Sequence, residues 1–289
     1  MFRAIKKGDI PTINRYIQGG YKVNDNPLLF LKSCLYENTQ VIELLLSNGA
    51  DVNGTSDTIP LIVAVENGKG VTVNLLLKHG ADPNRCGRDK ITALHVAARR
   101  GYLIMATELL SSGANVNSVD SSGRTPLCVI VPHYTISRLL LNHGADPNVE
   151  PDYCLTPIQQ AAYNGDVDTA TILVQHGAKI SHRALYYALT GKRESLRVVI
   201  FLLENGVDPN TTKRHGNLFH LFLEQCNIRR ELDIETLGLF LIHGGDLPNT
   251  LNSQIHTDIK AWILYYQRSL ALIYAEVMPI DLIRKLTEY

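Results

Sequence analysis

Apolar residues recur along this chain in short clusters, and each cluster ends in a polar turn that contains glycine. Residues 75–84 read LLLKHGADPN, and close variants occupy residues 44–53, 109–117, 139–148 and 202–210. The turn glycines lie 29 to 38 residues apart, and they are Gly20, Gly49, Gly80, Gly113, Gly144, Gly177, Gly206 and Gly244. A period of this length predicts an array of one supersecondary unit, whose copies can bury their apolar faces only against their neighbours.

A second recurring element lies about twenty residues before three of these glycines. It reads TALHVAA at residues 92–98, TPLC at residues 125–128 and TPIQQAA at residues 156–162. Together the two elements resemble the ankyrin repeat, whose pattern is a Thr-Pro-Leu-His opening, two helices and a Gly-Ala-Asp-x-Asn turn. The resemblance covers residues 1–249, because weaker copies of the turn extend to that point.

Each feature of the pattern has a physical reason. Pro126 suits the first helical position, where no backbone N–H is needed. Thr92, Thr125 and Thr156 are placed to cap the first helices of their repeats. Paired small residues such as Ala97 and Ala98, or Ala161 and Ala162, allow close approach of neighbouring repeats. The turn glycines suit the left-handed residue that ends a helix.

The resemblance implies an all-α ankyrin-repeat solenoid of about eight helix pairs. Short β-hairpin fingers are expected on the central repeats, near residues 85–91, 118–124 and 149–155, with a further one at 211–216. The fifth pair is two residues short, and we expect Pro132 to end its first helix early. We expect a repeat array over residues 1–249 and a separate helical segment over residues 250–289.

The carboxyl-terminal segment has two interpretations. Residues 255–274 are amphipathic with a helical period, so this segment suits a cap over the open end of the array. The stretch at residues 278–286 instead resembles the first helix of an F-box, and a SOCS box is a further alternative. Under that hypothesis the ligase-docking residues are Met278, Pro279, Leu282, Ile283 and Leu286.

The charge balance limits the kinds of partner that we expect, and the cysteines limit the expected cellular compartment. Twenty-eight basic residues balance twenty-eight acidic ones, so no global field favours nucleic acid or an anionic membrane. Residues 1–8 lack the apolar core of a signal peptide, and no apolar run approaches the length of a membrane span. Five cysteines without metal-type spacing favour a reducing compartment. We therefore expect a cytoplasmic protein, with the nucleus as an alternative.

No pattern of residues predicts catalysis. Four histidines precede turn glycines, where the last helical turn favours a cation or a backbone hydrogen bond. His95 and His220 occupy the position at which the ankyrin family has a histidine that bonds across adjacent fingers. We expect no enzyme activity, no catalytic residue, no metal and no cofactor.

The resemblance places the partner surface on a concave face, formed by the finger tips and the exposed ends of the first helices. Arginine and tyrosine, which often anchor protein interfaces, gather there. The predicted binding residues are Arg88, Asp89, Arg99, Arg100, Ser121, Arg124, Asp152, Tyr153, Tyr163 and Asn164.

We expect a non-enzymatic scaffold that binds one or more proteins through an acidic segment of the partner. The first alternative is a substrate-recognition adaptor of a cullin-type ubiquitin ligase, which docks through residues 270–289. A third class is a regulator that blocks the active site of an enzyme.

Overall fold

The computed structural model describes residues 1–55, 58–130, 133–191 and 196–210, together with residues 212–213, 216–218, 222 and 240. The described part contains thirteen α-helices and one pair of two-residue strands. The helices are α1 (Phe2–Lys7), α2 (Ile10–Gln18), α3 (Pro27–Tyr36), α4 (Thr39–Ser47), α5 (Pro60–Glu66), α6 (Gly70–Lys78), α7 (Ala93–Arg100), α8 (Leu103–Ser111), α9 (Tyr134–Asn142), α10 (Pro157–Asn164), α11 (Val167–Gln175), α12 (His182–Thr190) and α13 (Leu196–Glu204). The strands are β1 (Thr212–Lys213) and β2 (Gly216–Asn217).

The chain divides into two compact units. The first unit comprises residues 1–161 and 168–179, and the second comprises residues 162–167 and 180–289. The expected boundary between residues 249 and 250 lies outside the described residues and stays a prediction. The same holds for the eighth helix pair, apart from a few residues, and for the whole segment at 250–289.

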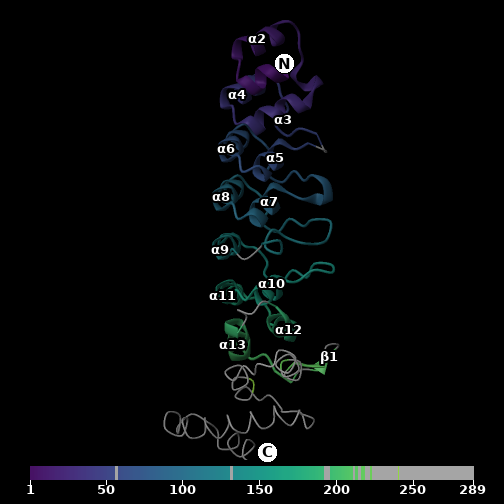
Figure 1. The fold of residues 1–289 in the computed structure, drawn as a ribbon, viewed down its shortest axis with the longest axis vertical. Coiled ribbons are helices and arrows are strands. Elements are labelled where there is room, and N and C mark those ends of the chain that lie inside the picture. Colours follow the sequence, from purple (N-terminus) through teal and green to yellow (C-terminus); the bar gives the residue numbers. More distant parts are fainter. Residues whose placement is uncertain are drawn as a thin grey trace, which may run out of the picture. The chain divides into compact units, whose positions relative to one another are not determined.

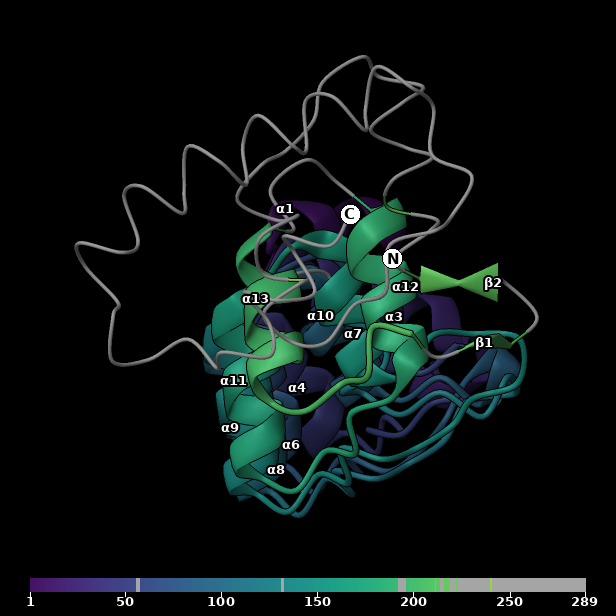
Figure 2. The ribbon, with the colours of Figure 1, turned by 90° about the horizontal axis from the view of Figure 1, so that it is seen from below.

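Helices of the first unit stack in two layers. Helices α1, α3, α5 and α7 contact one another in sequence and form the inner layer. Helices α4, α6, α8 and α9 form the outer layer beside them (Figure 1). The loops that connect one pair to the next project on the side away from the outer layer (Figure 2). This arrangement confirms the all-α ankyrin array.

The inner layer depends on small side chains. Ala97 and Ala98 are fully buried in α7, and Ala161 and Ala162 are buried in α10. A helix with two consecutive alanines on its packed face lets its neighbours approach closely, so larger side chains from both sides fill the space between repeats. The predicted burial of these alanines is confirmed.

The fifth repeat departs from the prediction. Residues 126–129 form turns and not a helix, so the expected first helix is absent and Thr125 caps none. The Thr125 hydroxyl instead donates to Cys128 Sγ at 3.3 Å. Two prolines only six residues apart, with two valines and an isoleucine between them, leave too short a run to offset the cost of helix nucleation. Pro132 itself lies outside the described residues.

The central fingers also differ from the prediction, because residues 85–91, 118–124 and 149–155 contain no β-strand. Only an isolated bridge between Cys86 and Thr92 closes the first of them. The tip of the first finger is a 3-10 turn at Arg88–Lys90, in which Asp89 has a positive φ of 57°. This turn takes up the middle of the finger and leaves too few residues on either side for more than a single bridge. Antiparallel strands β1 and β2 do form within the predicted finger at 211–216 and the residue that follows it.

A ladder of side-chain amides joins successive turns in the first unit. We call this set the asparagine ladder, and its members are Asn24, Asn53, Asn84, Asn117 and Asn148. The Oδ1 atom of each accepts a hydrogen bond from a backbone N–H of the next turn, at 2.6 to 3.0 Å. Four of them also donate from Nδ2 to the carbonyl oxygen of the next turn glycine, at 2.6 to 3.0 Å.

The ladder stops where the first unit ends. Asn148 bonds to Gly177 and to Lys179, which is the last residue of that unit. Four residues after Gly177 the chain carries Ser181 in place of an asparagine. Its side chain caps no backbone N–H of α12. The sequence therefore has no asparagine side chain here that could bond to the following turn.

The burial of Ala98 predicts sensitivity to added volume. Ala98→Leu should lower the free energy of unfolding by about 1–3 kcal/mol, because the larger side chain cannot fit between repeats. Ser121→Leu, at an exposed finger position, should change it by less than about 0.5 kcal/mol. Chemical denaturation of the two variants measures the difference, and equal effects would refute the assigned packing.

The asparagine ladder predicts a second contrast. Asn117→Ala removes two inter-repeat hydrogen bonds and should cost about 1–2 kcal/mol of unfolding free energy. Asn142→Ala is the matched control, because this exposed asparagine ends α9 and belongs to no ladder contact. If both variants unfold at the same denaturant concentration as the parent protein, the ladder adds nothing to stability.

Candidate functional site

The candidate site is a surface formed by three successive fingers and the end of α7. We call it the finger face, and it comprises residues 85–91, 118–124 and 149–155 with Arg99 and Arg100. Neighbouring fingers are hydrogen-bonded to each other: Ser121 N–H donates to the Asp89 carbonyl at 2.8 Å, and Asp152 N–H donates to the Ser122 carbonyl at 3.2 Å. These bonds fix the spacing of the three fingers.

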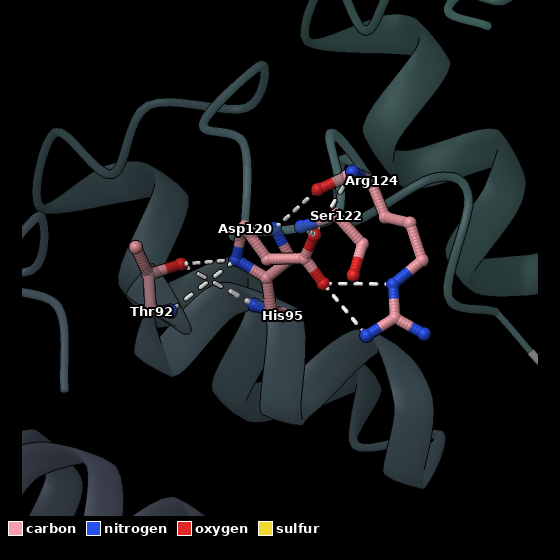
Figure 3. Close-up of polar contacts among 5 residues, drawn as sticks. All are labelled: Thr92, His95, Asp120, Ser122 and Arg124. Atoms are coloured by element: carbon pink, nitrogen blue, oxygen red, sulfur yellow. Dashed lines mark hydrogen bonds and ion pairs between the residues drawn. The ribbon is translucent and has the colours of Figure 1, made fainter. Parts of the chain in front are cut away.

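His95 connects the start of α7 to the next finger (Figure 3). His95 N–H donates to Thr92 Oγ1 at 3.4 Å, and Thr92 N–H donates to His95 Nδ1 at 3.3 Å, which together form a capping box. Because Nδ1 accepts this bond, the ring proton lies on Nε2, which donates to the Arg124 carbonyl at 3.0 Å. The predicted bond from His95 across adjacent fingers is confirmed. His220 lies outside the described residues.

Burial lowers the pKa of His95 below its ordinary value of 6.5, although the hydrogen bond to the Arg124 carbonyl acts in the opposite direction. The ring is almost fully buried, so a charged imidazolium would lose its hydration. Protonation of Nδ1 would also convert it to a donor facing the Thr92 N–H. His95 is therefore a neutral structural residue, and it is not placed to act as a base toward a substrate.

Asp120 is the centre of the second finger (Figure 3). Its Oδ1 accepts from the backbone N–H groups of Ser122 at 2.8 Å and Arg124 at 3.0 Å. Its Oδ2 accepts from Arg124 Nε at 2.7 Å and lies 2.7 Å from Arg124 Nη2. The Asp120 side chain is 2% exposed, whereas that of Arg124 is 36% exposed.

These contacts determine the charge state of Asp120. Burial by itself raises the pKa of a carboxyl group, but the hydrogen bonds and the charge of Arg124 outweigh it, and the pKa of Asp120 is lowered from 3.8. The carboxylate is thus ionised and bonded within the finger. Sequence reasoning missed Asp120, although aspartate followed three residues later by glycine is a recognisable turn signal.

Arg124 has a structural role that the prediction did not include. Its guanidinium is bonded to Asp120, and its carbonyl accepts from His95. Only part of this side chain remains for a partner. The other predicted residues of the finger face are exposed, and they are Arg88, Asp89, Arg99, Arg100, Ser121, Asp152 and Tyr153.

Tyr153 is the most prominent side chain of the finger face. It is fully exposed, and its backbone is in the left-handed region with φ at 54°. A bulky residue in this region is held there by its surroundings at a cost in free energy, and such positions cluster at functional sites. Two further predicted residues, Tyr163 and Asn164, end α10 and belong to the second unit.

The described residues hold no group of histidine, cysteine and acidic side chains that could bind a metal ion. Cys34 and Cys128 are buried, and burial raises the pKa of the Cys34 thiol to about 12. Cys86 and Cys154 are exposed on fingers. Among the described helices, none has the length and apolar character that crossing a membrane requires.

Comparisons with known families agree on one assignment. A model of ankyrin repeats in three copies matches residues 1–87 and 72–151, and a model of ankyrin repeats in many copies matches residues 132–174. These matches lie within residues 1–174. No finding supports the F-box or SOCS-box resemblance, and Met278, Pro279, Leu282, Ile283 and Leu286 lie outside the described residues.

Three curated proteins illustrate the range of relatives. YahD of Escherichia coli (strain K12), named as an ankyrin repeat protein, is 27% identical over 189 residues, which cover 61% of this chain and 94% of YahD. FPV031 of Fowlpox virus (strain NVSL), named likewise, is 33% identical over 156 residues, covering 48% of this chain and 46% of FPV031. Cyclin-dependent kinase inhibitor 2A of Monodelphis domestica is 34% identical over 116 residues, covering 39% of this chain and 66% of the inhibitor.

The lowered pKa of His95 predicts a pH-dependent stability. As the pH falls, the unfolded chain binds a proton at His95 near pH 6.5, before the folded protein does. The contribution of His95 to the free energy of unfolding is therefore complete above pH 6.5 and is lost as the pH falls toward the pKa of the folded state. His95→Gln should remove this part of the pH dependence while retaining the cap. Gln159 already forms an equivalent capping box with Thr156.

Unfolding free energies of the parent protein and His95→Gln, measured between about pH 7.5 and 5, test this point. The difference between the two proteins should change steadily below pH 6.5 and stay constant above it. A constant difference over the whole range would show that the pKa of His95 is the same in the folded and unfolded states.

Proposed function

The chain belongs to the ankyrin repeat family, and we propose that it is a non-enzymatic module that binds a partner protein through the finger face. One observation carries the proposal: three fingers are bonded to each other and to the Asp120–Arg124–His95 network, while their outer side chains stay exposed. A preorganised surface loses little conformational freedom on binding, so more of the contact energy appears as affinity.

The charges of the finger face favour an acidic partner segment. Arg88 and Lys90 on the first finger and Arg99 and Arg100 at the end of α7 are all exposed, and Asp89 is the one acidic residue on these two segments. Arginine binds carboxylates through two parallel hydrogen bonds, which adds geometric specificity. We infer a partner that presents carboxylates to these residues.

Tyr153 supplies the apolar part of the proposed contact. Tyrosine has few rotatable bonds and buries a large area, and it is enriched among residues that dominate binding energy. Its exposed position on the third finger places it one finger beyond Arg124. Asp152 and Glu150 are also exposed on that finger, so a partner that extends this far meets acidic groups there.

A second candidate function is the inhibition of a partner enzyme. The similarity to a cyclin-dependent kinase inhibitor, 34% identical over 116 residues, favours it. Under this second proposal the finger face covers the active site of the partner enzyme and contributes no catalytic group. The cysteine content of the sequence supports a cytoplasmic or nuclear location for either function.

The combined variant Arg99→Ala/Arg100→Ala tests the proposal. Affinity purification with the parent protein and with this variant identifies partners that depend on the two arginines. For such a partner we expect affinity to fall by about 2 kcal/mol or more if the ion pairs are desolvated, and by less than about 1 kcal/mol if they lie on the rim. The affinity of the parent protein should also depend more strongly on salt than that of the variant.

Arg3→Ala/Arg15→Ala is the matched control, because it removes the same charge from exposed residues of the first repeat. Both variants should unfold like the parent protein. Unchanged affinity for Arg99→Ala/Arg100→Ala, or an equal loss in the control, would place the working surface elsewhere.

A further inference from the structure

A second exposed surface lies at the start of the outer helices α6, α8 and α9. Four large apolar side chains are solvent-accessible there: Val71 is 61% exposed, Leu103 39%, Ile104 75% and Tyr134 37%. We call these four residues the outer stripe. Single exposed apolar residues are common on protein surfaces, so the significance of the outer stripe depends on whether its members are neighbours.

Contacts between the repeats bring these helix starts together. Helix α6 contacts α8, and α8 contacts α9. A Cβ built on Gly70, the first residue of α6, would lie 3.7 Å from Met105 Cε in the first turn of α8. A Cβ built on Gly101, just before α8, would lie 2.8 Å from Nε2 of His133, just before α9. The starts of the three helices are therefore adjacent.

The members of the outer stripe also share their position within the repeat. Val71 and Ile104 each lie nine residues before the turn glycine of their repeat, and Leu103 and Tyr134 each lie ten residues before it. At the same two positions the preceding repeat has Thr39 and Gln40, and the repeat of α11 has Val167 and Asp168. The exposed apolar side chains thus cover three central repeats. Two polar residues follow them on one side, and a half-buried valine and an exposed aspartate follow on the other.

Basic residues adjoin the outer stripe. Arg138 places its guanidinium 5.7 Å from the centre of the Tyr134 ring, and Arg100 is exposed just before α8. The acidic residues on these segments are less available. Glu108 Oε1 accepts from Asn74 Nδ2 at 3.1 Å and its Oε2 is buried, and Glu37 forms an ion pair with Lys69 at 3.4 Å. The exposed acidic residues near this surface are Glu66, at the end of α5, and Asp168, at the position of Ile104 in the repeat of α11.

We propose that the outer stripe docks an acidic amphipathic helix of a partner protein, laid across the starts of α6, α8 and α9. Packed helices lie about 8–10 Å apart. Seven residues of an α-helix advance by about 10.5 Å. A docked helix with apolar residues seven positions apart therefore meets Val71, Ile104 and Tyr134 in turn. Glutamates or aspartates beside them face Arg100 and Arg138. Arg100 belongs to both surfaces, but docking at the outer stripe does not require the function proposed for the finger face.

The test uses a synthetic probe and the full chain. The probe is a fluorescein-labelled peptide of about 18 residues, with leucines on one helical face and glutamate and alanine elsewhere. Its control is a peptide of the same composition with the leucines scrambled around the helix. Fluorescence anisotropy should show that the amphipathic peptide binds at least about tenfold more tightly than the scrambled one.

Single substitutions locate the binding site. Ile104→Glu should weaken binding of the amphipathic peptide about tenfold or more, because it places a carboxylate in the apolar centre. Leu28→Glu is the matched control, since Leu28 is 49% exposed on α3 and lies outside the outer stripe. Both variants should keep the circular dichroism spectrum and melting temperature of the parent protein.

Other occupants would overturn the proposal. Equal binding of the two peptides, or equal effects of Ile104→Glu and Leu28→Glu, would contradict a helix-docking site. Cosedimentation with vesicles of phosphatidylcholine and phosphatidylserine that is lost in Ile104→Glu, without peptide binding, would assign the surface to membranes. A dimer in analytical ultracentrifugation that Ile104→Glu dissociates, again without peptide binding, would assign it to a second copy of this chain.

Discussion

The asparagine ladder is the constraint on which the arrangement of the first unit depends. Each amide of the ladder satisfies polar backbone groups of the following turn that have no partner within their own repeat. A repeat can therefore neither slide nor tilt against its neighbour without losing these bonds. The alanine pairs of the inner layer add a second constraint, because their small size sets how closely α7 approaches the helices beside it.

The finger face follows from this fixed spacing. Once the repeats are held in place, the fingers are close enough to bond to one another, and the Asp120 carboxylate closes the middle finger onto its own backbone. His95 then ties that finger to α7. The buried charge of Asp120 and the neutral ring of His95 are both used within the fold, whereas Arg99, Arg100 and Tyr153 are exposed and available for the recognition that we propose.

Much of the fold could be predicted from the sequence, because the repeat period predicts the helix pairs and the glycine turns mark where the second helices end. The buried alanines, the Thr92 cap and the inter-finger role of His95 follow from the same pattern. The missing helix of the fifth repeat could not be read from the repeat alone, because it depends on two prolines that leave too short a run between them. The absence of strands in the central fingers depends on how many residues each tip uses for its turn, as at Arg88–Lys90, and the sequence does not indicate this number.

The candidate site was predicted in outline only. The exposed arginines and tyrosines could be placed by position in the repeat, but the pairing of Arg124 with Asp120 is a three-dimensional fact of the finger turn. The outer stripe was not anticipated, since its residues belong to helices whose other apolar positions are buried or half-buried. Exposure distinguishes Ile104 from Leu109 of the same helix, and it becomes visible only when the neighbouring repeats are in place.

Amide hydrogen exchange, followed residue by residue with NMR, tests the central role of the asparagine ladder most directly. The decisive amides belong to exposed residues whose N–H groups bond to ladder side chains, namely Asp51, Asp82, Asn115, Asp146 and Lys179. We expect these amides to exchange slowly, at rates close to those of the helix interiors, because they open only when neighbouring repeats separate. Exchange at the rate of an unstructured chain would contradict it and show that the turns move independently of one another.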